Sequence, residues 1–159
     1  MTAARRASDT GAVADPDLVG GPHLPGRTPR PPEAAFAPLK AALEGADDPA
    51  ALAASAAFGA ALRLFERRYY WEAHEMFEAV WIRLPPASAE RVLLRGLIQL
   101  SNAGLKARMG RGRATARILA LADADLAEVA ARAPAGAMGL TPGALAALRC
   151  QAAGEADDE

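Results

Sequence analysis

One short stretch of the chain combines a histidine with several glutamates at helical spacing. Residues 70–81 read YWEAHEMFEAVW, so His74, Glu75 and Glu78 lie within five positions. An α-helix advances about 100° per residue, which places His74 and Glu78 on one face, one turn apart. An imidazole and a carboxylate at this spacing can pair with each other, hold a metal ion or line a site for a small polar ligand.

A helical projection predicts which of these side chains are buried. With Tyr70 at zero, His74 falls at about 40° and Glu78 at about 80°, within the apolar arc. Glu75 lies at the edge of that arc, and Glu72 lies opposite, where solvent is expected. Burial of an unpaired carboxylate or imidazole costs several kcal/mol. We therefore expect His74 and Glu78 to have partners.

Three interpretations of this cluster remain open. The first is a buried polar network in which Gln99 and Asn102 on the following helix supply partners, since satisfied interior networks are common in helical domains. The second is a pocket for a small ligand. The third is a metal site with His74 and Glu78 as ligands and Glu75 or Gln99 nearby. The candidate pocket or polar cluster comprises Tyr70, Trp71, Glu72, His74, Glu75, Glu78, Trp81 and Gln99.

Nucleophilic catalysis has little support in the sequence. The other histidine, His23, falls in a segment rich in Pro and Gly, so no Ser/His/Asp arrangement is indicated. The single cysteine, Cys150, cannot form an internal disulfide or a multi-cysteine zinc site. Gly110 and Gly112 flank Arg111, but the lysine and spacing of a phosphate-binding loop are missing. We therefore predict no catalytic residue and no cofactor.

Charge and hydropathy narrow the class of protein further. The formal net charge is -1 and the pI is about 6.1. Nucleic-acid binders usually carry a basic excess, so this sequence does not predict nucleic-acid binding. No run reaches the roughly 18–20 apolar residues of a membrane span, so no membrane association is expected. An apolar leader region is not recognisable, and the cytoplasm is the expected compartment. The partner is unknown, and a homo-oligomer remains open.

Hydrophobic periodicity predicts an all-α fold. Apolar residues recur at spacings of three and four along the chain, with no strict alternation. We expect a compact antiparallel bundle of about five helices, occupying residues 33–152 as a single domain. A disordered tail is expected at residues 1–32 and an acidic tail at residues 153–159. The predicted helical segments are 32–43, 49–68, 70–84, 88–109, 113–132 and 142–151.

Two blocks of sequence resemble the signature of domain of unknown function 309, a bacterial and archaeal helical family. The blocks are LFERRYYWEAHEMFEAVW at residues 64–81 and GLIQL at residues 96–100, followed by Gly110. The resemblance covers about residues 50–130 and implies a helical bundle without implying an activity. The family's distinctive polar residues would here be Glu72, His74, Glu75, Glu78 and Gln99.

The chain departs from the family pattern just before the histidine block. Glu66 stands where the family usually has Asn, and Arg68 stands near its usual Gly. A tight left-handed turn is less favourable without Gly or Asn, so the local geometry of the cluster is open at this point.

Two functions follow from the sequence. One is a non-enzymatic binding or scaffold module, in which a buried His/Glu cluster is structural or holds a small ligand. The alternative is a metal-dependent hydrolase with His74 and Glu78 as ligands and Glu75 as base. Whether the protein is an enzyme stays open at this level.

Overall fold

The computed structural model describes residues 21–155 and is all-helical over that range, as predicted. No β-strand occurs among these residues, where the only extended pairing is an isolated bridge between Ala137 and Leu140. The short elements are a 3₁₀ turn (η3, Glu33–Ala35), α1 (Ala37–Ala41) and α2 (Pro49–Ala53). The longer helices are α3 (Ala56–Glu66), α4 (Tyr70–Trp81), α5 (Ala89–Arg108), α6 (Gly112–Arg132) and α7 (Pro142–Gly154).

Side-chain caps explain where several helices begin. Ser88 accepts a hydrogen bond from the N–H of Arg91 at the start of α5, and Thr141 does the same for Ala144 at the start of α7. Each cap satisfies one of the backbone donors that a first helical turn leaves unpaired. These starts agree with the expected segments 88–109 and 142–151.

The expected helix at residues 49–68 is divided into two. α2 ends at Ala53, and Ser55 caps α3 by accepting from the N–H of Phe58. The hydroxyl of Ser55 also donates to the carbonyl of Leu52. A serine that bonds to nearby backbone in both directions competes with helix continuation, which accounts for the break.

The expected helix at residues 32–43 is also divided. Pro38 lies in the first turn of α1, where the missing N–H of proline costs nothing, and η3 precedes it. The apolar residues of this segment are buried, with Phe36, Leu39 and Leu43 each no more than 3% exposed.

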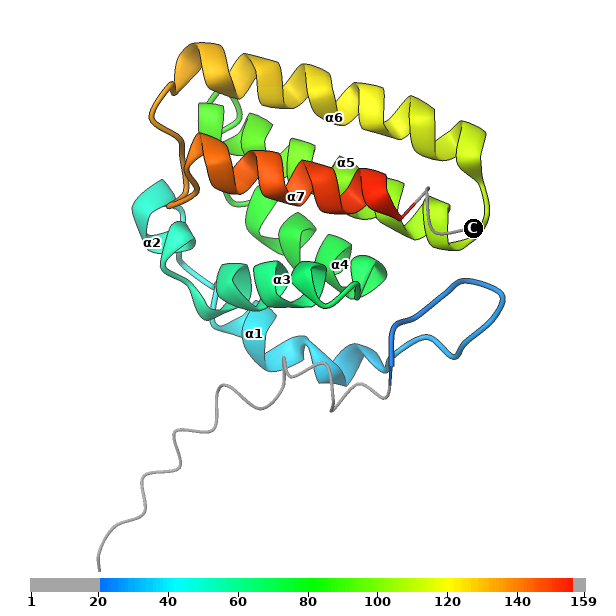
Figure 1. Ribbon diagram of the computed structural model, residues 1–159. Helices are drawn as coiled ribbons and strands as arrows, with labels where there is room; N and C mark the ends of the chain where they lie inside the picture. Colours follow the sequence, from blue (N-terminus) through cyan, green and yellow to red (C-terminus); the bar gives the residue numbers. More distant parts are fainter. Residues whose placement is uncertain (1–20, 156–159) are drawn as a thin grey trace, which may run out of the picture.

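Helix α5 is the centre of the bundle. It packs against α4 on one side, α6 on another and α7 on a third, while α3 packs against α4 (Figure 1). This position accounts for the many buried residues of α5, because a helix with neighbours on several sides needs little polar surface. Edge-to-face and tilted ring contacts extend the core, with ring centroids 5.2 Å apart for Phe65 and Tyr70 and 6.1 Å apart for Phe58 and Phe77.

The N-terminal segment differs from the expected tail over part of its length. Of the predicted tail at residues 1–32, residues 1–20 lie outside the described part of the chain. Residues 21–32, which we call the N-terminal clasp, pack against α4 instead of leaving the bundle. His23 is only 9% exposed, and Thr28 closes the segment into a loop by accepting from the N–H of Leu24.

The first residues of the predicted acidic tail at residues 153–159 pack with the bundle. α7 continues to Gly154, and Glu155 is 8% exposed because it bonds to Tyr70 and Arg68. Residues 156–159 lie outside the described range.

None of the helices described is both long enough and apolar enough to cross a lipid bilayer.

Candidate binding site on helix α4

Helix α4 carries all but one of the predicted site residues. It presents Tyr70, Trp71, Glu72, His74, Glu75, Glu78 and Trp81, and Gln99 lies on α5. The structure distributes these residues among three environments: a surface cluster, a buried carboxyl beneath the clasp, and separate contacts with the rest of the bundle.

The surface cluster consists of His74, Glu75 and Glu78. The Nδ1 atom of His74 lies 3.5 Å from Oε1 of Glu75, and its Nε2 atom lies 3.8 Å from Oε2 of Glu78. One donor atom from each residue can be chosen so that all three lie within 4.8 Å of one another. The spacing expected from the helix is therefore confirmed, and the three groups face a common point.

The expected burial of these glutamates is reversed in the structure. The side chain of Glu78 is 54% exposed, so Glu78 lies at the surface, whereas that of His74 is 23% exposed and is only partly buried. Glu72, expected to face solvent, is fully buried. The reason is tertiary: the N-terminal clasp covers the face of α4 that carries Glu72, and the N–H of His23 donates to Oε1 of Glu72 at 2.7 Å.

The buried carboxyl of Glu72 is only partly satisfied. Its Oε2 atom has no hydrogen-bond partner in the part of the chain described. Removal from water raises the pKa of Glu72 above its ordinary value, and the hydrogen bond from the N–H of His23 opposes that rise. A carboxyl group buried with one free oxygen is an unfavourable arrangement, which singles out Glu72 among the buried groups.

Trp71 lies beside Glu72 and also contacts the clasp. The ring of His23 meets the Trp71 ring edge-on, with centroids 5.0 Å apart, and the guanidinium of Arg30 lies 5.0 Å from the centroid of the same ring. Sequence reasoning missed both His23 and Arg30 as site residues. The Pro- and Gly-rich composition of residues 20–32 indicated disorder, and no local pattern connects them with α4.

Tyr70 takes part in a structural network away from this face. Its hydroxyl donates to Oε1 of Glu155 at 2.7 Å and accepts from Nε2 of Gln151 at 3.1 Å. Burial is the main cause of a pKa well above the ordinary range for Tyr70. The network joins the start of α4 to the end of α7.

Trp81 and Gln99 do not join the surface cluster through polar contacts. Trp81 is covered by the guanidinium of Arg91, 4.2 Å from its ring centroid. Gln99 is half-buried on α5, and its amide makes no hydrogen bond to His74 or Glu78 within residues 21–155. The predicted network between α4 and Gln99 is therefore not formed.

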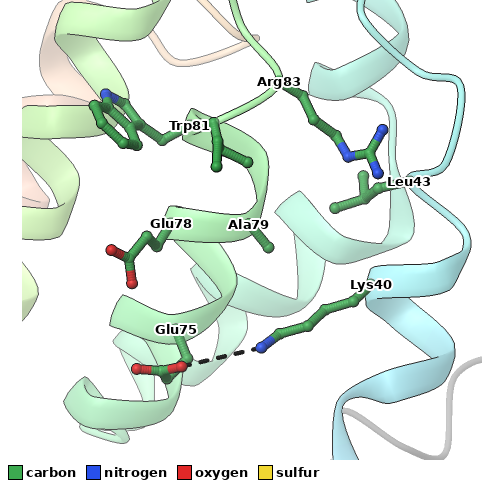
Figure 2. A pocket seen from close by; sticks show the side chains of 8 residues that line it. Lys40, Leu43, Glu75, Glu78, Ala79, Trp81 and Arg83 are labelled. Carbon is green, nitrogen blue, oxygen red and sulfur yellow. Dashed lines mark ion pairs between the residues drawn. The ribbon is translucent and has the colours of Figure 1, made fainter.

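Two hollows lie between α4 and the segment of residues 30–43, which includes α1. The first, of about 350 Å³, is lined by Lys40, Leu43, Glu75, Glu78, Ala79, Trp81, Ile82 and Arg83 (Figure 2). The second, of about 360 Å³, is lined by Arg30, Pro31, Glu33, Phe36, Lys40, Trp71 and Glu75. Lys40 and Glu75 line both, and their charged atoms are 4.0 Å apart. The hollows therefore lie on either side of a single ion pair.

Comparison with protein families assigns the central part of the chain. Residues 58–118 match the model of a family described as "Domain of unknown function (DUF309)". No curated protein and no solved structure matched the chain.

The DUF309 match runs from α3 into the first turns of α6 and includes every site residue that the sequence predicted. It does not reach the N-terminal clasp or α1, so His23, Arg30 and Lys40 lie outside the matched region. The family description assigns no activity.

Proposed function

We propose that this protein is a non-enzymatic helical binding module that holds a small ligand on the face formed by α1 and α4. The observation that carries the proposal is the pair of hollows on either side of Lys40 and Glu75. Each hollow has room for a small molecule and combines apolar lining with a few charged groups, as ligand sites commonly do.

The chemistry of the lining favours a polar ligand that carries charge. Lys40 is joined by Arg30 in one hollow and by Arg83 in the other, and Glu75 is accessible from both. Trp71 and Trp81 are among the lining residues, one in each hollow. The Lys40–Glu75 pair is long, at 4.0 Å, and both side chains are partly exposed, so a ligand can displace it at little cost.

A thermal-shift screen tests this proposal. The protein is heated with amino acids, dicarboxylates and mononucleotides, each at millimolar concentration. We expect at least one compound to raise the melting temperature of the unmodified chain and to lose that effect in Glu75→Gln. Glu128→Gln, an exposed change on α6, is the matched control and should respond as the unmodified chain does. A panel without any Glu75-dependent shift contradicts the proposal.

A second candidate function, a metal-dependent hydrolase, is favoured by the surface cluster. His74, Glu75 and Glu78 offer one imidazole nitrogen and two carboxylate oxygens, a donor set that suits divalent first-row transition metals. With His74 and Glu78 as ligands, Glu75 would be placed to orient the imidazole or accept a proton. A bound metal would supply Lewis-acid chemistry and lower the pKa of a bound water.

Elemental analysis decides whether this second candidate stands. Untagged protein purified without chelator should contain near-stoichiometric metal, which His74→Ala should lose and His23→Ala should retain. Because the side chain of His74 is partly exposed and its two carboxylate partners are accessible to solvent, we expect His74→Ala to change the free energy of unfolding by no more than about 1 kcal/mol. Equal metal content in the two variants, or none in any of the proteins, rejects the hydrolase.

A further inference from the structure

A single residue of the N-terminal clasp, His23, contacts two neighbouring residues of α4, Trp71 and Glu72. The backbone of His23 donates to the carboxyl of Glu72, and the ring of His23 contacts the ring of Trp71 nearly at a right angle. The same residue of the clasp therefore reaches both groups, so the carboxyl and the indole lie together beneath it. A second contact comes from Arg30, whose guanidinium lies over the Trp71 ring.

The carboxyl of Glu72 has unused hydrogen-bonding capacity at this place. A carboxylate accepts up to about four hydrogen bonds. The clasp donates one, to Oε1, and Oε2 has no partner although the residue is fully buried. Structures seldom retain such a group without a reason, because an unsatisfied buried acceptor costs free energy that a hydrogen-bonded one does not.

An aromatic face next to a buried carboxylate is suited to an organic cation. A guanidinium stacks on an indole and donates paired N–H groups to a carboxylate, whereas a neutral group gains neither interaction in full. The clasp already places a guanidinium on Trp71 and an N–H donor on Glu72. Arg30 and His23 thus supply, from two separate residues, the interactions that one guanidinium ligand would make.

We propose that Trp71 and Glu72 form a binding site for a guanidinium group, and that the clasp occupies this site in cis through Arg30 and His23. The inference rests on the proposed binding function, because Trp71 and Arg30 also line the second hollow. It adds the chemical class of the ligand and a means of regulation. An external guanidinium competes with Arg30 for the site. Only molecules with an open clasp bind it, so the apparent affinity of the protein for the ligand is the intrinsic affinity multiplied by the fraction of open molecules.

The test follows the fluorescence of Trp71. The chain has two tryptophans, so Trp81→Phe leaves Trp71 as the only tryptophan, and the variants for fluorescence are made in that background. Because Trp81 lines the first hollow, thermal shifts are measured on the same variants with Trp81 retained. The probe is L-arginine amide, and the control ligand is L-citrulline amide, in which an uncharged urea group of similar shape replaces the guanidinium. We expect arginine amide to quench Trp71 at lower concentration than citrulline amide, and Arg30→Ala to lower its dissociation constant at least tenfold.

Two further variants separate binding from folding. Arg27→Ala changes an exposed arginine of the clasp that does not touch Trp71, and its dissociation constant for the probe should match that of the parent. Glu72→Gln in the Arg30→Ala background keeps the shape of the side chain and should abolish the preference for arginine amide. Its helical circular dichroism and melting transition show whether the fold is retained.

The possible results divide cleanly. Equal binding of arginine and citrulline amides, or equal effects of Arg30→Ala and Arg27→Ala, overturns the inference. If the Glu75-dependent thermal shift persists in the matching variants that retain Trp81, the inference fails while the proposed function stands. If neither response is seen, both fall.

Discussion

Gly104 is the residue that allows α5 to approach the ring of Tyr70. A Cβ atom added at Gly104 would lie 2.7 Å from two ring carbons of Tyr70 and 2.9 Å from a third. Such separations are well below van der Waals contact, and the Tyr70 ring cannot retreat because its hydroxyl is held by Glu155 and Gln151. The close packing of α4 on α5 therefore depends on a missing side chain.

We expect Gly104→Ala to lower the free energy of unfolding by about 1–3 kcal/mol, because overpacking here outweighs the gain in helix propensity. Urea denaturation followed by circular dichroism measures the change. Gly112→Ala is the control, since a Cβ at the start of α6 meets nothing within 4 Å, and its stability should be unchanged or slightly raised. A Gly104→Ala protein as stable as the parent would show that the Tyr70 ring can move.

His74 and Glu72 show, at the same scale, what spacing can and cannot predict. The proximity of His74 to Glu75 and Glu78 follows from the helix alone, because neighbours one turn apart share a face whatever surrounds them. The burial of Glu72 does not follow, because it is produced by His23, 49 positions earlier in the chain. Local geometry therefore predicted the cluster, and a long-range contact decided which carboxyl is buried.

The junction between α3 and α4 contains a residue in a strained backbone conformation close to the site. Arg68 adopts a left-handed conformation with φ of 66°, at the position near which the family pattern has Gly. Its Nε lies 2.8 Å from Oε1 of Glu155, so the side chain offsets part of the backbone cost. The left-handed turn, whose formation the sequence did not decide, is therefore present, with Arg68 in place of glycine.

Comparing Arg68→Gly with Arg68→Ala isolates that backbone cost. Both variants lose the ion pair with Glu155, but only glycine relieves the positive φ. We expect Arg68→Gly to be more stable than Arg68→Ala by about 1 kcal/mol in denaturant unfolding. Equal stability of the two variants would mean that the junction relaxes to another conformation once the arginine is removed.

Across the whole molecule, Tyr70 connects the site helix to the C-terminal helix. Its hydroxyl bonds to Glu155, 85 positions away, and Gln151 also donates to the backbone carbonyl of Phe65. Helices α3, α4 and α7 are therefore joined at one point. The buried hydroxyl holds its proton more strongly in the folded state than in the unfolded state, since burial raises the pKa of Tyr70.

This difference predicts a loss of stability in alkali. Because the folded pKa is raised, the contribution of Tyr70 is fully present below the unfolded pKa of about 10 and is lost as the pH rises above it. The stability of the unmodified protein should fall by up to about 1.4 kcal/mol more per pH unit above 10 than that of Tyr70→Phe. Urea unfolding of both proteins at several pH values from 7 to 11 measures this, and parallel curves would contradict it.

The sequence by itself determined the helices and most of their ends. Periodicity of three and four, the caps at Ser88 and Thr141, and the prolines at helix starts are local signals that act within one turn of the chain. Only the tertiary structure decided that Glu72 is buried, that Glu78 is exposed, and that the clasp lies on Trp71. These depend on contacts between distant segments, and a projection of one helix contains no information on what covers each of its faces.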